Sequence, residues 1–105
     1  SELMQYKVIL RQFFYNCFES TDVTQETKYV RAYREIQLPF VPFVGLALSL
    51  GENLDWVSIN RVTWIERDEC FECRCNNEYF QGGFDDAIKD KVSELWSVSN
   101  VLGGE

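Results

Sequence analysis

The sequence predicts an α+β fold, in which a five-stranded, mainly antiparallel sheet is packed by one C-terminal helix. Aromatic and β-branched residues alternate with polar residues over much of the chain, as they do in half-buried strands. Clusters of turn-forming residues interrupt this alternation, and a helical stripe of apolar residues follows near the end. The alternation leaves open whether the sheet curls into a partial barrel.

The length and composition predict one domain. With 105 residues, of which 46% are hydrophobic, the chain is long enough to bury a single core. We therefore expect residues 4–102 to form a single globular domain. Ser1–Leu3, which precede Met4, are expected to be a cloning remnant, and Gly103–Glu105 a flexible tail.

Two long strands are expected in the first part of the chain. The first extends over Tyr6–Phe18 and is followed by a polar loop at Glu19–Glu26. The second extends over Thr27–Leu38, where a regular alternation predicts one buried face and one solvated face. The solvated face of the second strand consists of Tyr29, Arg31, Tyr33, Glu35 and Gln37.

The third strand is preceded by two prolines. Pro39 and Pro42 cannot donate hydrogen bonds to a strand ladder, so Leu38–Phe43 is expected to be a sheet edge or a crossing between strands. Val44–Leu50 is the expected third strand, and Gly51–Asp55 is the turn that follows it.

The fourth and fifth strands are expected to form a hairpin. The apolar residues of Trp56–Glu66 change parity partway along, which predicts a β-bulge near Asn60–Arg61. A turn at Arg67–Glu69 leads into a strand at Cys70–Cys75, and Asn76–Asn77 forms the next turn.

A helix is expected after Gly82 and Gly83. The apolar residues that follow are spaced so that they share one face of a helix. Two acidic residues, Asp85 and Asp86, lie where the positive end of the helix dipole favours them. The apolar stripe consists of Phe84, Ile88, Val92, Leu95 and Trp96.

The four cysteines allow two interpretations. Cys70, Cys73 and Cys75 are close together and Cys17 is remote, so four thiolates could in number hold a Zn²⁺ ion. Structural zinc ligands, however, usually come as two C-x₂₋₄-C pairs, which this spacing does not provide. Free cysteine is among the most buried residue types, so we expect buried apolar side chains and no metal or cofactor.

All of the net charge comes from the second half of the chain. Residues 1–50 hold five acidic and five basic residues, whereas residues 51–105 hold twelve acidic and five basic residues and account for the net charge of −7. A negative surface repels double-stranded nucleic acid and anionic membranes and attracts basic partners. The chain shows no secretory signal after Met4 and no apolar stretch of the roughly 20 residues that a membrane span needs, so we expect a cytoplasmic protein.

The composition argues against an enzyme. The chain contains no histidine, which is the usual general base and a common metal ligand, and no catalytic motif. Paired carboxylates could still act as acid and base, but those available flank a predicted hairpin turn, where acids are normally solvated. These carboxylates belong to Glu66, Asp68, Glu69 and Glu72.

Two functions remain. The first is a non-catalytic protein-interaction domain, such as an inhibitor or immunity protein that masks a basic, nucleic-acid-acting partner. Its partner-binding residues are expected to be Glu66, Asp68, Glu69, Glu72, Tyr29, Arg31 and Tyr33. The alternative is a small-molecule or nucleotide binder with an aromatic and arginine pocket on a curled sheet. The residues of that pocket are expected to be Trp56, Arg61 and Trp64.

Uncovered apolar surface predicts a homodimer. One helix cannot readily cover the apolar residues near the prolines, which include Phe40 and Phe43. We expect a symmetric interface of about 1,200 Å² or more, formed by Pro39–Leu50 or by the helix face that bears Trp96.

Overall fold

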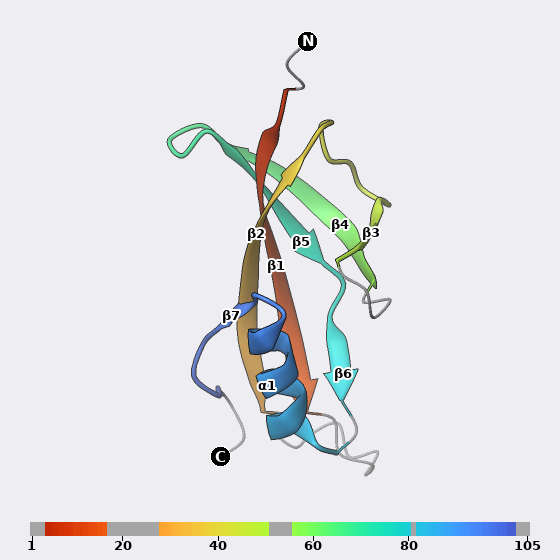
Figure 1. Ribbon diagram of the computed structural model, residues 1–105, viewed down its shortest axis with the longest axis vertical. Coiled ribbons are helices and arrows are strands. Elements are labelled where there is room, and N and C mark those ends of the chain that lie inside the picture. Colours follow the sequence, from red (N-terminus) through yellow and green to blue (C-terminus); the bar gives the residue numbers. More distant parts are fainter. Residues whose placement is uncertain (1–3, 17–27, 51–55, 81, 103–105) are drawn as a thin grey trace. The chain divides into compact units, whose positions relative to one another are not determined.

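The computed structural model describes residues 4–16, 28–50, 56–80 and 82–102. Within them the chain forms one helix and a mostly antiparallel sheet of seven strands (Figure 1). The strand order is β3-β4-β5-β1-β2-β7, with β6 also paired to β1, and the described strands leave the sheet open rather than closed. The elements are β1 (Tyr6–Asn16), β2 (Tyr29–Leu38), β3 (Ala47–Ser49), β4 (Trp56–Ile65), β5 (Cys70–Cys75), β6 (Glu78–Phe80), α1 (Phe84–Ser93) and β7 (Ser97–Val98).

The predicted α+β class is therefore confirmed, but the sheet has seven strands instead of five. The two additional strands, β6 and β7, have three and two residues and are too short to show an alternation in the sequence. The third strand is also shorter than predicted, since β3 covers only Ala47–Ser49 of Val44–Leu50. The expected loop at Glu19–Glu26, the turn at Gly51–Asp55 and the expected remnant and tail at the two ends lie outside the described residues.

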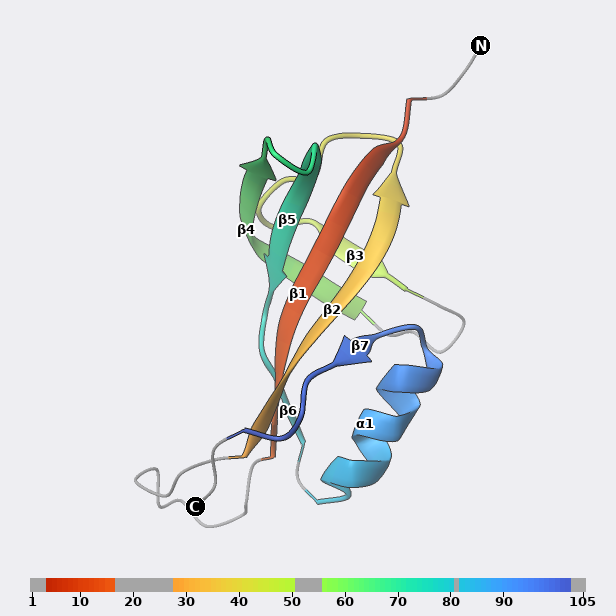
Figure 2. The ribbon, with the colours of Figure 1, turned by 90° about the vertical axis from the view of Figure 1, so that its left-hand side faces the viewer.

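Strand β1 pairs with two consecutive strands, and both run parallel to it. Residues 8–11 pair with residues 71–74 of β5, and residues 14–16 pair with residues 78–80 of β6. β2 is the other neighbour of β1 in the strand order and runs antiparallel to it (Figure 2). The sequence does not predict the parallel pairs, because it indicates which residues form strands but not which distant strands become neighbours.

The described residues form two compact units. The first contains β3, β4 and β5 with parts of β1 and β2, in residues 4–11, 34–50 and 56–76. The second contains β6, α1 and β7 with the remaining parts of β1 and β2, in residues 12–16, 28–33, 77–80 and 82–102. That residues 4–102 form a single domain stays a prediction.

The β4–β5 hairpin builds much of the core of the first unit. Ile59 lies opposite Cys75 but Arg61 lies opposite Arg74, so the register shifts at Asn60. This shift confirms the predicted β-bulge, and it brings the apolar residues of both halves of β4 to one face of the hairpin. The buried apolar residues of this unit are Val8, Leu10, Leu38, Val57, Ile59, Cys70, Cys73 and Cys75.

The cysteines of this unit are buried and free, as the sequence predicts for Cys70, Cys73 and Cys75. Burial raises the pKa of Cys73 to about 11, and the charge of Glu72 adds to this increase. Burial raises the pKa of Cys75 to about 12, with a smaller contribution from Cys73. Because the thiolate is the nucleophile and the metal ligand, both thiols are poorly reactive at neutral pH. Cys17 lies outside the described residues.

We expect these thiols to resist modification in the native protein. In a Cys17→Ser variant at pH 8, Ellman's reagent should label almost no thiol until urea unfolds the chain, because Cys73 and Cys75 remain protonated and covered. As the pH rises above 9.0, the unfolded chain loses these protons first, so the free energy of unfolding should fall towards pH 11 to 12. Rapid labelling of the folded protein at pH 8 would contradict this burial.

The core of the second unit lies between its strands and helix α1 (Figure 2). Phe14 is fully buried, and its ring centroid lies 5.9 Å from that of Phe80 and 5.7 Å from that of Trp96. The ring of Phe84, the first residue of the helix, lies 6.2 Å from that of Phe80. These four aromatic rings join the helix to β1 and β6.

The helix ends earlier than its apolar stripe predicts. The N–H of Trp96 donates to the carbonyl of Lys91, and the N–H of Leu95 donates to the carbonyl of Val92, both at 3.1 Å, which is a Schellman motif. Leu95 has a φ of 74°, a conformation for which this motif usually employs glycine. The predicted stripe is therefore wrong at Val92 and Leu95, which are exposed, whereas the chain reversal returns Trp96 to the core.

Lys91 is a buried charge on the inner face of α1. The residue is 7% exposed, and its Nζ lies 3.4 Å from Oε2 of Glu78 on β6. The same Nζ lies 5.5 Å from the centroid of the Phe14 ring. A carboxylate and an aromatic face together compensate an ammonium group for the hydration that it loses on burial. The sequence places Lys91 between Ile88 and Leu95 without indicating that it faces the core.

Removing one partner of this pair should destabilise the protein more than removing the buried charge itself. Glu78→Gln leaves the ammonium group without its carboxylate and should lower the free energy of unfolding by about 1–2 kcal/mol, less than for a fully buried pair because Glu78 is 35% exposed. Lys91→Met keeps the side-chain length without the charge and should change it by less than about 1 kcal/mol.

Urea unfolding measures both effects, and Lys89→Met, an exposed change on the same helix, serves as the control. A larger loss for Lys91→Met than for Glu78→Gln would show that the charge itself stabilises this core.

Candidate functional site

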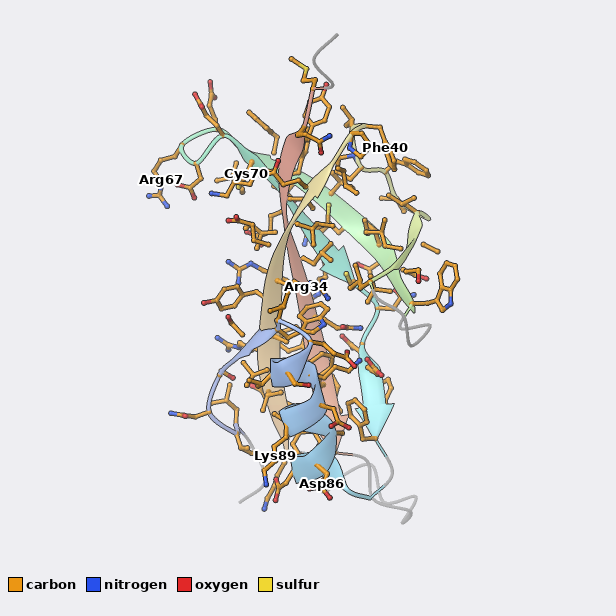
Figure 3. The ribbon with its side chains drawn as sticks, viewed as in Figure 1. Arg34, Phe40, Arg67, Cys70, Asp86 and Lys89 are labelled. Atoms are coloured by element: carbon orange, nitrogen blue, oxygen red, sulfur yellow. The ribbon has the colours of Figure 1, made fainter. Side chains whose placement is uncertain are left out.

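The turn between β4 and β5 carries three carboxylates at the tip of a hairpin. Residues 66–69 form the turn, and the N–H of Glu69 donates to the carbonyl of Glu66 at 3.2 Å. Asp68 lies between them, and its Oδ1 is 3.8 Å from Nε of Arg67, whose side chain is 89% exposed (Figure 3). All four side chains are exposed, which agrees with the solvated placement that the sequence predicts. We call Glu66, Asp68 and Glu69 the acidic turn.

Glu72 does not belong to the acidic turn, although the sequence groups it with these residues. It lies within β5 and is partly buried, opposite Thr63 of β4 and Ile9 of β1. Its Oε1 accepts an ion-paired contact from Nε of Arg11 at 3.0 Å. The carboxylate of Glu72 is therefore engaged within the sheet of the first unit.

An exposed apolar segment links β2 to β3 in the same unit. Its aromatic residues, Phe40 and Phe43, lie with their ring centroids 6.4 Å apart (Figure 3). The segment is anchored where the N–H of Gly45 donates to the carbonyl of Ile59 at 2.8 Å, and the φ of 96° at Gly45 suits glycine. The exposed residues of this apolar segment are Phe40, Val41, Phe43 and Val44.

The second unit carries the predicted residues Tyr29, Arg31 and Tyr33. Arg31 and Tyr33 are exposed, as the sequence predicts, and the N–H of Arg31 donates to Oγ of Ser99 at 3.0 Å. Tyr29 is partly buried, because it belongs to a row of aromatic rings that the sequence does not predict.

This row extends over three strands of the second unit. The ring of Tyr15 on β1 is stacked on that of Tyr79 on β6, with centroids 5.3 Å apart and planes at 17°. The ring centroid of Tyr29 on β2 lies 5.5 Å from that of Tyr15 and 5.9 Å from that of Phe13. The sequence gives no signal for Tyr79, since β6 is too short to be recognised as a strand.

The structure does not bring Trp56, Arg61 and Trp64 together as one pocket. Trp56 begins β4 and lies opposite Ser49, whereas Trp64 is near its end with its ring 4.9 Å from that of Phe71. The two tryptophans are eight positions apart along β4, which corresponds to about 26 Å of strand. The bulge places Trp64 on the face of the hairpin that forms its core. Trp56 projects from the opposite face.

The described residues contain neither a cluster of potential metal ligands nor a helix that could span a membrane. No group of three His, Cys, Asp or Glu side chains among them is arranged to hold a metal ion. Helix α1, the helix of the described residues, is too short to cross a membrane. Trp96, which the sequence places in one of the two expected dimer interfaces, is only 3% exposed.

Comparison of the chain with protein-family models, with curated proteins and with solved structures found no match.

Proposed function

We propose that this protein is a non-catalytic interaction domain that binds a basic protein, as an inhibitor or immunity protein would. The observation that carries the proposal is the acidic turn, where three carboxylates within four residues are exposed at the tip of a hairpin. Carboxylates in this position are not engaged in the core and are open to an approaching partner. A basic, nucleic-acid-acting protein is the partner class that such a surface attracts and masks.

The charge of the chain supports the same partner class. Its net charge of −7 strengthens attraction to a basic protein at long range, and the attraction weakens as salt screens it. Three free, buried thiols agree with a reducing compartment, and we propose that the protein acts in the cytoplasm.

The apolar segment supports a second contact, with another copy of the chain. Four apolar side chains that follow one another closely in sequence are exposed beside a short strand. Exposed apolar patches of this kind normally mark interfaces. We propose a homodimer through the Pro39–Leu50 region, which leaves the acidic turn to the basic partner.

We expect the acidic turn to determine capture of the basic partner. The triple variant Glu66→Gln, Asp68→Asn, Glu69→Gln removes three charges and should weaken binding by about tenfold or more at low salt, with a smaller dependence on salt concentration. Asp85→Asn, Asp86→Asn, Asp90→Asn is the matched control, because it removes three exposed carboxylates from α1 in the other unit.

The measurement is quantitative affinity capture from the native host with both variants, followed by salt titration of each captured protein. The proposal requires a basic protein that the wild-type chain and the control bind and the acidic-turn variant loses. Equal losses in both variants, or capture of no basic protein, would overturn it.

The apolar segment should hold the dimer. Light scattering of the wild-type protein should give about twice the chain mass of 12.3 kDa at high micromolar concentration. Phe40→Ser with Phe43→Ser should give a folded monomer, since the exposed rings contribute little to the core of their own unit. Val92→Ser with Leu95→Ser removes two other exposed apolar side chains and should leave the dimer intact. A monomeric wild-type protein would refute the dimer.

A further inference from the structure

Three arginines lie side by side on the sheet of the first unit. Arg61 of β4 is opposite Arg74 of β5, and Arg74 is in turn beside Arg11 of β1. β5 lies between β4 and β1 in the strand order (Figure 2). We call these three residues the arginine row.

The three side chains share one face of the sheet. Arg74 lies between the buried residues Cys73 and Cys75, and Arg11 follows the buried Leu10, so alternation directs both arginines away from the core. Arg61 joins them because directly paired residues project to the same side of a sheet. All three side chains are exposed, and neighbouring strands are about 4.8 Å apart, so the row spans about 10 Å.

The arginine row concentrates positive charge on three strands of the first unit. The charged residues of β1, β4 and β5 are Lys7, Arg11, Arg61, Glu72 and Arg74. Glu72 pairs with Arg11, and Nζ of Lys7 pairs with Glu35 of β2 at 3.5 Å. These strands therefore hold three arginines and one carboxylate once the Lys7 pair is set aside. This local excess of positive charge favours an anion as the ligand.

We propose that the arginine row binds a di- or triphosphate group of a small molecule. The guanidinium group is planar and donates paired hydrogen bonds that match the oxygen atoms of phosphate, and three groups in line match a chain of phosphates. The Thr63 hydroxyl, exposed and opposite Glu72, is on the same face and can donate another hydrogen bond.

The charge of the whole chain selects a small anion over a polymer. Residues 51–105 contain twelve acidic residues, and this field opposes a long polyanion whose charges extend well beyond the row. Screening limits the repulsion to about 8 Å at physiological salt, so a ligand that is confined to the row is much less affected. This site is independent of the acidic turn, and either one can fail without the other.

Isothermal titration with inorganic tripolyphosphate tests the site, with orthophosphate and sulfate at equal ionic strength as competing anions. We expect saturable binding of tripolyphosphate, and a loss of affinity of about tenfold or more in Arg61→Gln and in Arg74→Gln. Arg67→Gln is the matched control, because it removes the same charge from the same hairpin outside the row. Its affinity should stay within about twofold of wild type.

Folding of each variant is checked by thermal unfolding without ligand, where Arg61→Gln should be at least as stable as wild type because it removes a like-charge contact. Equal weakening by Arg67→Gln would show a nonspecific charge effect and overturn the proposal. If binding of tripolyphosphate does not saturate by about 10 mM, its dissociation constant is too high for a specific site, and the proposal is overturned as well.

Two further ligands test which kind of molecule supplies the phosphate groups. Adenosine triphosphate should bind at least as well as tripolyphosphate and show the same loss in Arg61→Gln and Arg74→Gln if the row recognises a nucleotide's phosphates. Oligouridylate that binds more tightly than tripolyphosphate would contradict the restriction to small anions and overturn the proposal.

Discussion

The alternation of side chains along β1 is the constraint on which the cores of both units depend. Val8, Leu10 and Phe14 are each fully buried, and Gln12 is buried on the same face, whereas Ile9, Arg11 and Phe13 project to the other face. In the first unit this alternation packs Val8 and Leu10 with the hairpin and exposes Arg11. In the second it packs Phe14 against α1 and leaves Tyr15 for the aromatic row. A shift of one residue in the register of β1 would exchange these roles.

The bulge at Asn60 connects packing with surface chemistry in the first unit. Without it, Ile59 and Val62 would project to opposite faces, and one half of β4 would expose its apolar residues. The same shift sets Arg61 opposite Arg74. The arginine row is therefore a consequence of how β4 satisfies the core. Net charge by itself gives no indication of such a local concentration, because residues 51–105 contain twelve acidic residues and only five basic ones.

Much of the candidate site could be predicted from local sequence. The acidic residues at 66–69 are exposed because turn-forming residues separate two alternating strands, and turns lie in solvent. Exposure of Phe40 and Phe43 follows from the prolines, which exclude this segment from the ladder. Only closeness in sequence groups Glu72 with the turn, and its pairing with Arg11 depends on a strand some sixty residues away.

The sequence by itself determined the α+β class, the two long strands, the bulged hairpin, the buried cysteines and the start of the helix, because each depends on periodicity or on residues that are near one another. The tertiary structure alone decided the parallel neighbours of β1, the short strands β6 and β7, and the burial of Lys91 in place of Val92. These features depend on contacts between distant segments. A two- or three-residue strand or an inward lysine is stable only when a neighbouring strand supplies its hydrogen bonds or its carboxylate, and local sequence carries no record of that neighbour.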